Sequence, residues 1–342
     1  MNESGRASLP AYDFLTDHAR AMSFSPPDAK SSLEFGQQNT PFADPSDKQS
    51  VVLASYNIRY AVGSHLITSG LLRKLGYDFP RNRSQAVARN ISDAARVFSE
   101  GKLLPRPDIL ALQESDKETG RAGRQHVARQ LADQIGSAFI HLSAGLPRGI
   151  AQEQREWWLN FEEHISLNDS GETGVALLHH LPVENVERLD LPWHDCPWRP
   201  RVALAVTFNI AHRKVRLINV HISPHSGMAN QHEQTEAVLE HAKAFDGPVI
   251  ILGDFNTLSK EKEIDIRRLM ESRGYSTPFP IGVPTWRGAG LRFHADWIFV
   301  RDLRVVRWGV AKPRGISDHW PIWAEVQTSD VRHQRSDDSL EG

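Results

Sequence analysis

A carboxylate and a carboxamide stand two residues apart in the stretch Gly253-Asp254-Phe255-Asn256. The apolar run 249–252 before it predicts a buried strand, and a stretch compatible with a helix follows it. Because side chains alternate with a period of two along a strand, Asp254 and Asn256 are expected on one side of the chain. Oxygen ligands of this kind hold hard cations, and an ionised aspartate beside a cation can hold a nucleophilic water. The same residues also suit an ordinary turn, so the chemical interpretation depends on whether other polar groups join them.

Acidic, amide and imidazole side chains recur where other predicted strands end. These residues are Asn57, Glu114, His221, Asp296, Asp318 and His319. The set suits cleavage of a phosphate ester, which needs a cation to neutralise charge on the phosphate oxygens, a base to orient water and an acid or metal for the leaving group. Because the set is rich in carboxylates and has no thiol, it favours Mg²⁺ or Mn²⁺ over Zn²⁺.

The elements that must position these groups are strands first joined by helices and later by hairpins. Strands are predicted at 51–58, 107–112, 138–142, 174–180, 187–191, 202–210, 215–221, 294–300, 305–310 and 321–326. Helices are predicted at 84–99, 125–135, 230–244 and 261–272. The strands 202–210 and 215–221 form a predicted hairpin that turns at 211–214. This order predicts an α/β protein with two packed sheets, because a single doubly wound sheet would keep its helical connections throughout.

The 342 residues are enough for one large α/β domain or two smaller ones, and the motifs predict one domain with a polar segment at each end. Residues 1–49 are rich in Ser, Pro, Asp, Gln and Asn, and we expect a mostly disordered arm with a short helix at 11–24. The domain is predicted to span residues 50–327, and residues 328–342 form a polar tail. Within the domain, the segment 143–173 loses the regular alternation, which is typical of functional or disordered loops.

Composition excludes several classes of protein. The net charge of −2 gives no global positive field for nucleic acid, although a local basic rim around a metal site would suffice. The single cysteine, Cys196, excludes an internal disulfide and a thiolate metal cluster. No signal-peptide pattern opens the chain, and no apolar run approaches the ~18 residues needed to span a bilayer. We therefore expect a cytoplasmic monomer without stable membrane insertion.

Six motifs in order resemble the endonuclease/exonuclease/phosphatase superfamily, of which deoxyribonuclease I is a familiar member. They read Ser55-Tyr56-Asn57-Ile58-Arg59, Leu112-Gln113-Glu114, Asn219-Val220-His221, Gly253-Asp254-Phe255-Asn256, His294-Ala295-Asp296-Trp297-Ile298 and Ile316-Ser317-Asp318-His319-Trp320-Pro321. A fainter block at 174–178 also looks like the family, and the resemblance covers roughly residues 51–327. Each motif alone is weak, but their joint order and spacing are specific. The resemblance implies a four-layer α/β/β/α sandwich of two packed mixed sheets, like that of deoxyribonuclease I.

The resemblance also implies a metal site. Glu114, with Asn57 and Asp318, would hold the principal Mg²⁺, for which Mn²⁺ is a possible substitute. Asp254 and Asn256 would orient the attacking water or contribute to a second metal position.

Phosphate contacts are implied in the same way. His319, paired with Asp296, would face the scissile phosphate, as would His221. Arg59 stands where abasic endonucleases carry an acid, so it is a candidate for a phosphate contact.

Two further pairs of residues remain open from the sequence. Trp157 and Trp158 are candidates for substrate binding by stacking on bases, and they could equally cap the core beneath a long loop. Arg199 and Arg201, at the start of a predicted strand, are interpreted as structural ion-pair residues.

The sequence thus predicts a Mg²⁺-dependent phosphoesterase, a phosphodiesterase with nucleic acid as its substrate. One alternative is a phosphatase or phosphodiesterase for a small or lipid substrate, such as an inositol phosphate or sphingomyelin, because fold analogy does not choose among substrates. Enzymes of lipids need an exposed apolar loop, whereas the loops here are interpreted as polar. Another alternative is a catalytically inactive binding module, which loss of the metal carboxylate or the motif histidines would mark. None of these residues is lost.

Overall fold

Two mixed β-sheets form the centre of the computed structural model, which describes residues 32–37, 42, 48–145, 159–160, 163, 165, 169–192, 200–224 and 227–328. The seven-stranded sheet has the order β1 (Leu33–Gly36), β5 (Ala138–Ser143), β7 (Gly174–His179), β4 (Ile109–Gln113), β2 (Ser50–Asn57), β16 (Ile322–Thr328) and β15 (Leu303–Val310). The five-stranded sheet has the order β14 (Asp296–Arg301), β11 (Val249–Asp254), β10 (Arg213–His221), β9 (Arg201–Ile210) and β8 (Glu184–Leu191).

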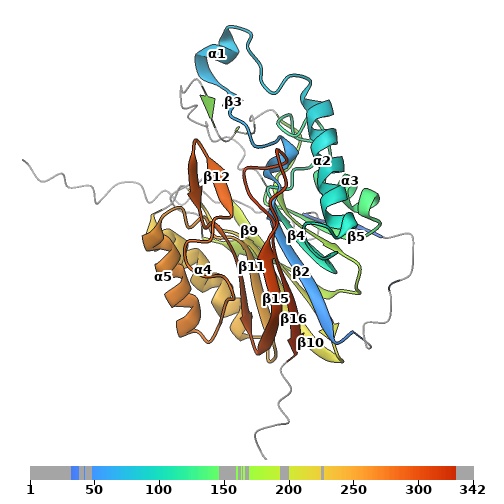
Figure 1. Ribbon diagram of the computed structural model, residues 1–342, viewed down its shortest axis with the longest axis vertical. Coiled ribbons are helices and arrows are strands. Elements are labelled where there is room, and N and C mark those ends of the chain that lie inside the picture. The colour runs from blue at the N-terminus through green and yellow to red at the C-terminus, as the bar shows by residue number, and fades with distance from the viewer. Residues whose placement is uncertain are drawn as a thin grey trace, which may run out of the picture.

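Helices cover the outer face of each sheet. The helices α2 (Arg83–Glu100) and α3 (Val127–Ile135) lie on one side, and α4 (Met228–Lys243) and α5 (Lys260–Ser272) lie on the other (Figure 1). The predicted four-layer α/β/β/α sandwich is confirmed, and the predicted hairpin is the antiparallel pair β9–β10.

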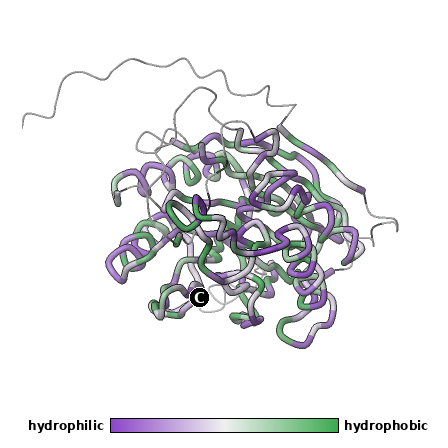
Figure 2. Tube along the Cα trace, turned by 90° about the horizontal axis from the view of Figure 1, so that it is seen from above, coloured by the Kyte–Doolittle hydropathy of each residue, from purple (hydrophilic) through white to green (hydrophobic). Residues whose placement is uncertain are grey.

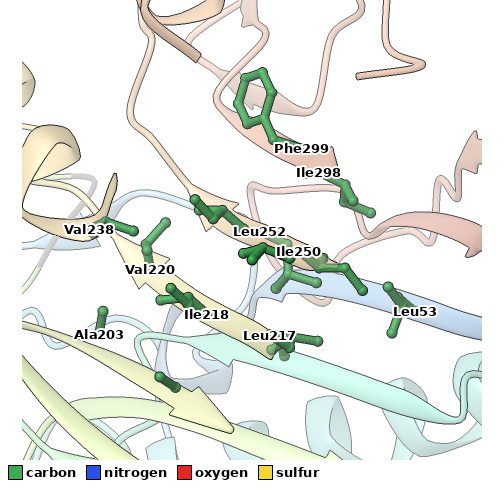
Figure 3. Packing of buried hydrophobic residues seen from close by; sticks show 14 of the residues in the cluster. Leu53, Ala203, Leu217, Ile218, Val220, Val238, Ile250, Leu252, Ile298 and Phe299 are labelled. Atoms are coloured by element: carbon green, nitrogen blue, oxygen red, sulfur yellow. The ribbon is translucent and has the colours of Figure 1, made fainter. Parts of the chain in front are cut away.

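The alternation of side chains along the strands divides the core into layers. In β2, Leu53 belongs to the larger apolar cluster, while its neighbour Ala54 belongs to the cluster beneath α2 and α3. Figure 3 shows Leu53, Leu217 and Leu252 of the larger cluster between the strands of the two sheets. Many outer turns of the chain are hydrophilic (Figure 2). Burial of these apolar faces therefore fixes which side chains of each strand face the other sheet.

A buried polar link joins the sheets at one edge. The Asn219 amide donates hydrogen bonds to the carbonyl oxygens of Leu112 (3.0 Å) and Ala176 (2.9 Å) in the opposite sheet. Its Oδ1 accepts a 2.7 Å hydrogen bond from Gln113 Nε2. Because Asn219 lies two residues before His221 on the same face of β10, this link fixes the strand ends that carry the polar motifs.

Several short elements are absent from the sequence prediction. They are β1, η2 (Arg59–Ala61), β3 (Ile67–Thr68), α1 (Gly70–Lys74), β6 (Leu159–Asn160), β12 (Trp286–Gly288) and β13 (Leu291–Phe293). Strand β1 lies within the predicted arm and pairs with β5, so the arm contains at least one ordered strand. The helix predicted at 11–24 lies outside the described residues. In the part of the chain that the structure describes, no helix is long and apolar enough to cross a bilayer.

Candidate functional site

The predicted polar residues meet because the strands that carry them end at one edge. Strands β2 and β4 run parallel, as do β10 and β11, so each pair ends on the same side. In the five-stranded sheet, Asp254 lies beside His221 and opposite Asp296, the first residue of β14. Asn57 reaches them from the other sheet, where its Nδ2 donates a 2.9 Å hydrogen bond to Asp254 Oδ2. The site therefore lies across the junction of the two sheets.

Glycine is required directly before Asp254. Gly253 has a φ of 144°, and a Cβ atom there would lie 2.0 Å from the carbonyl oxygen of Val220 in β10. Any other side chain would push the two strands apart and separate Asp254 from His221. The glycine of the motif thus allows β11 to pack closely against β10.

Three of the predicted site residues adopt left-handed backbone conformations just beyond strand ends. The φ values are 48° for Arg59, 50° for Glu114 and 51° for Asn256. Such conformations cost on the order of 1 kcal/mol for residues other than glycine and cluster at functional sites, where the surrounding structure enforces them. Here they turn the chain sharply at the edge where the polar side chains meet.

Asp254 lies at the centre of the site. Besides the bond from Asn57, its Oδ2 lies 3.7 Å from His221 Nε2 and 3.6 Å from His319 Nε2. Its Oδ1 accepts a 2.8 Å hydrogen bond from the backbone N–H of Asn256, whose own amide donates to the Ile222 carbonyl. Burial raises the pKa of Asp254 above its usual range, against the opposing effect of the His319 charge. A buried carboxylate with a raised pKa is suited to accept a proton.

His319 and Asp296 form a buried pair. The ring Nδ1 of His319 lies 2.9 Å from Asp296 Oδ2. Burial by itself would lower the pKa of His319, but the charges of Asp296 and Asp254 outweigh it and raise that pKa to about 10. The ring is therefore an imidazolium held between two carboxylates.

Glu114 and His221 form the other side of the site, together with an arginine. Glu114 Oε1 lies 3.8 Å from His221 Nε2, and both residues line a pocket with Arg201. The shorter of two contacts from the buried Arg201 Nη1 reaches His221 Nδ1 at 2.8 Å. Because a guanidinium only donates, that nitrogen must accept, which leaves the imidazole proton on Nε2, facing Glu114 and Asp254.

Arg201 was interpreted from the sequence as a structural ion-pair residue, and the structure instead places it in the site. The predicted hairpin contained a signal for this position. A turn at 211–214 brings the start of β9 opposite the end of β10, where His221 lies.

Asp318 and Arg59 lie together at the edge of the site. Asp318 Oδ2 accepts a hydrogen bond from Trp286 Nε1 (3.2 Å) and lies 3.6 Å from Arg59 Nε. The buried guanidinium of Arg59 also donates to the carbonyl oxygens of Gly63 and His65. Arg59 thus fastens the chain that follows β2 to Asp318, and its predicted phosphate contact stays a prediction.

Two cations that sequence reasoning missed flank the site through Trp320, the residue after His319. The Arg287 guanidinium lies 5.6 Å and the Lys312 ammonium 5.1 Å from the centre of the Trp320 ring. No motif pointed to them, because Arg287 belongs to the unpredicted hairpin β12–β13. Cation–π contacts of this kind hold positive charge next to His319.

Other predicted residues lie outside the described part of the chain. These are Trp157, Trp158 and Arg199. Their roles stay as predicted from the sequence.

The donor set fits a hard divalent cation. Ligand atoms of Asp254, Asp296 and His319 lie within 4.8 Å of one another. Asp296 Oδ1 is buried without a hydrogen-bond partner among the described residues, which is costly for a carboxylate oxygen and which a cation would relieve. His319 is the weakest ligand of this group, because a protonated imidazole offers no lone pair at either nitrogen. The oxygen-rich remainder of the site is the expected environment for Mg²⁺ or Mn²⁺.

Solved structures of low sequence identity share this fold. An endonuclease/exonuclease/phosphatase from Beutenbergia cavernae superposes with a TM-score of 0.56 at 17% identity, over 82% of this chain and 72% of that chain. ANGEL2, a 2′,3′-cyclic phosphatase solved with adenosine-2′,3′-vanadate, superposes with a TM-score of 0.52 at 13% identity, over 86% of this chain and 98% of that chain. Among curated proteins, the UPF0294 protein YE0917 of Yersinia enterocolitica is 26% identical over 260 residues, which cover 59% of this chain and 96% of that protein.

The sequence itself matches one family over most of its length. Residues 54–319 match the Endonuclease/Exonuclease/phosphatase family, and this range contains the first five motifs and the sixth as far as His319. Its boundaries run from β2, just before Asn57, to His319. The chain therefore belongs to the endonuclease/exonuclease/phosphatase family and is a hydrolase of phosphate ester bonds.

Proposed function

We propose that the protein is a phosphodiesterase that depends on a divalent cation and uses Asp254 to activate water. The position of the Asp254 carboxylate supports this proposal more than any other observation. It is buried between one carboxamide and two imidazoles, within 4 Å of Asn57, His221 and His319. This arrangement combines a base with a cationic imidazole in one small volume, as hydrolysis of a phosphodiester requires.

In the proposed reaction, a water molecule attacks phosphorus and its proton passes to Asp254, while the P–O bond to the leaving oxygen breaks and that oxygen takes up a proton from solvent. Asn57 and Asn256 hold the carboxylate through its two oxygens, so its direction is fixed before the substrate binds. The imidazolium of His319 donates a hydrogen bond to a phosphoryl oxygen and stabilises the charge that develops there. Asp296 keeps the ring oriented and charged.

Glu114, Asn57 and Asp318 would hold Mg²⁺ as the resemblance implies, and Asp254, Asp296 and His319, whose ligand atoms lie within 4.8 Å of one another, would then act on the water and the phosphate. Mg²⁺ would neutralise negative charge on the phosphoryl group and its leaving oxygen. Asp318 is already oriented for such a role by the Trp286 indole and by Arg59.

The proposed substrate is nucleic acid, as the sequence analysis predicted. The cations held on Trp320 support an anionic polymer, because Arg287 and Lys312 would pair with phosphates that neighbour the scissile one. These residues supply the local basic rim that the net charge of the chain does not reveal.

A lipid phosphate ester is the second candidate substrate. It is favoured by large exposed apolar side chains on the segment that follows Arg59, including Leu71, Leu75 and Tyr77. Interfacial enzymes need such a surface, and nucleases do not.

A substrate panel tests both proposals. The panel contains plasmid, single-stranded DNA, RNA, phosphoinositides, sphingomyelin and a nitrophenyl phosphodiester, each with Mg²⁺, Mn²⁺ or EDTA. We expect cation-dependent hydrolysis of diesters that is lost in Asp254→Asn and kept in Asp265→Asn, a matched change on the surface of α5. Hydrolysis of monoesters alone would contradict the phosphodiesterase assignment, and full activity of Asp254→Asn would contradict its role as base.

A further inference from the structure

The chain between β3 and α2 forms a projection, which we define as residues 69–82. It starts where β3 pairs with β6, and it is closed at its base by two hydrogen bonds. The Thr68 N–H donates to the Phe79 carbonyl (3.3 Å), and the Phe79 N–H donates to Thr68 Oγ1 (2.8 Å). The His65 ring packs on Phe79 with centroids 4.9 Å apart. The loop is thus a closed unit, and Figure 1 shows its helix α1 standing away from the sheets at one end of the molecule.

Large apolar side chains are exposed along this projection. The exposed fractions are 50% for Leu71, 63% for Leu75, 58% for Tyr77 and 44% for Phe79. With Leu159 of the adjoining β6, the projection holds five of the twelve large apolar side chains that are exposed in the described residues. Single exposed apolar residues are ordinary, but such a concentration marks an interaction surface. The interpretation of the loops as polar is therefore wrong for this segment.

A second apolar tip rises from the same edge of the protein. The hairpin β12–β13 exposes Leu291 just beyond its turn. Asp318 connects the two structures, because Trp286 of this hairpin and Arg59, which holds the chain before β3, both contact its carboxylate. Both apolar tips therefore belong to the edge that contains the candidate active site, and α1 and β12 lie toward the same end in Figure 1.

Positive charge accompanies the exposed apolar groups. Residues 69–82 contain three cations, Arg73, Lys74 and Arg81, and one acid, Asp78. All four are exposed; Asp78 pairs with Arg83 at the start of α2 and Arg73 pairs with Glu163 at 2.8 Å, so Lys74 and Arg81 supply the surplus positive charge. Leucines and aromatic rings interleaved with lysine and arginine suit the boundary between acyl chains and anionic headgroups.

We propose that the 69–82 projection, together with the Leu291 tip, docks the protein on a membrane surface that carries anionic lipids. Leu71 and Leu75 favour a lipid surface over a nucleic acid strand, because aliphatic side chains do not stack on bases as aromatic rings do. The docked orientation turns the candidate active site toward the bilayer, because Arg59 of the site donates to the His65 carbonyl and the His65 ring packs on Phe79 of the projection. The inference does not depend on the proposed reaction, because docking needs no catalysis.

Vesicle flotation with the full chain tests membrane binding by this surface and requires no catalytic turnover. Wild-type protein is mixed with phosphatidylcholine vesicles with and without phosphatidylserine, in the presence of EDTA. We expect binding to the anionic vesicles, reduced about a hundredfold in Leu71→Ser/Leu75→Ser, because each buried leucine contributes roughly a tenfold factor. The matched control is Leu103→Ser, an equally exposed leucine near the start of β4, at the opposite edge of the sheet. It should bind as the wild type does.

A second variant separates charge from apolar contact. Lys74→Glu/Arg81→Glu should remove the preference for phosphatidylserine, and all variants should keep the wild-type melting temperature because the altered side chains are exposed. Absence of vesicle binding by the wild type, or equal binding by the double leucine variant, would overturn the proposal. Loss of single-stranded oligonucleotide binding in the leucine variant, without any vesicle binding, would assign the surface to nucleic acid and would likewise overturn it.

Discussion

His319 is held by Asp296 through a 2.9 Å contact at Nδ1, which leaves its other ring nitrogen 3.6 Å from Asp254. Asp296 begins β14, whereas His319 follows β15, so the pair joins two separate segments at the edge of the sandwich. Through this contact Asp296 orients the ring, and Asp254 remains able to accept a proton from water. Residues that act as one unit in this way should respond together to substitution.

Asp296→Asn and His319→Ala should each lower kcat by roughly 10²-fold or more, with little further loss in the double variant. The reason is that Asp296 acts through the imidazole and has no effect once the ring is removed. The measurement is a double-mutant cycle on diester hydrolysis. Losses that simply multiply would mean that the two residues act independently.

The same pair makes a prediction about protonation. In the metal-free protein the pKa of His319 is raised to about 10, and Asp296→Asn should shift it down because the largest of the stabilising carboxylate charges is gone. NMR titration of the imidazole nitrogens reports both values. A pKa near the ordinary histidine value in the wild-type protein would show that the carboxylates do not hold the ring as a cation.

Much of this site was readable from the sequence, and particular residues show why. Asn57, Asp254 and Asp296 lie at the ends of long apolar strands, where periodicity defines both the element and the face. Parallel pairing brings the ends of β2 and β4, and of β10 and β11, to a common edge, and antiparallel pairing places the start of β14 beside the end of β11. Hydrophobic patterning is strongest in such buried strands, so these positions were predictable.

Short elements could not be predicted from the sequence, and neither could the site residues that they carry. The hairpin β12–β13 has three residues in each strand, too few to establish a period, so Arg287 could not be placed beside Trp320. The same holds for β3, which has two residues, and for α1, which has five and exposes Leu71. Side chains exposed on a surface loop produce no periodic hydrophobic pattern in the sequence.

Arg287→Ala and Lys312→Ala should weaken substrate binding more than turnover. Each change should raise KM for an oligonucleotide about threefold to tenfold and reduce the dependence of KM on salt, because one phosphate contact is lost. The matched control is Arg304→Ala, since Arg304 lies on β15 and bonds to Gln327. An unchanged KM in both variants would remove these cations from the substrate path.

Stability should fall at acidic pH because of His141. This histidine is buried in β5, where its Nε2 donates to the Ser115 carbonyl at 2.7 Å, and burial lowers its pKa to about 4. The unfolded chain binds the proton with a pKa near 6.5, so the contribution is fully present above about pH 6.5 and is lost as the pH falls toward 4.

The full effect of His141 amounts to about 3 kcal/mol of unfolding free energy. Urea unfolding between pH 7 and about pH 4 measures it. His141→Gln should flatten the pH dependence, whereas His212→Gln, at the exposed β9–β10 turn, should not. Equal profiles for wild type and His141→Gln would show that this histidine is not the titrating group.

The most direct test of metal-dependent hydrolysis at this site compares wild type with Glu114→Gln. The measurement is the dependence of phosphodiester hydrolysis on Mg²⁺. Glu114 lies 3.8 Å from His221 in the site, and Glu100→Gln at the far end of α2 is the matched control. We predict that EDTA abolishes the wild-type rate, that Mg²⁺ restores it, and that Glu114→Gln lowers the restored rate by about 10²-fold or more while Glu100→Gln does not. A wild-type rate that survives EDTA and is unchanged in Glu114→Gln would contradict the assignment.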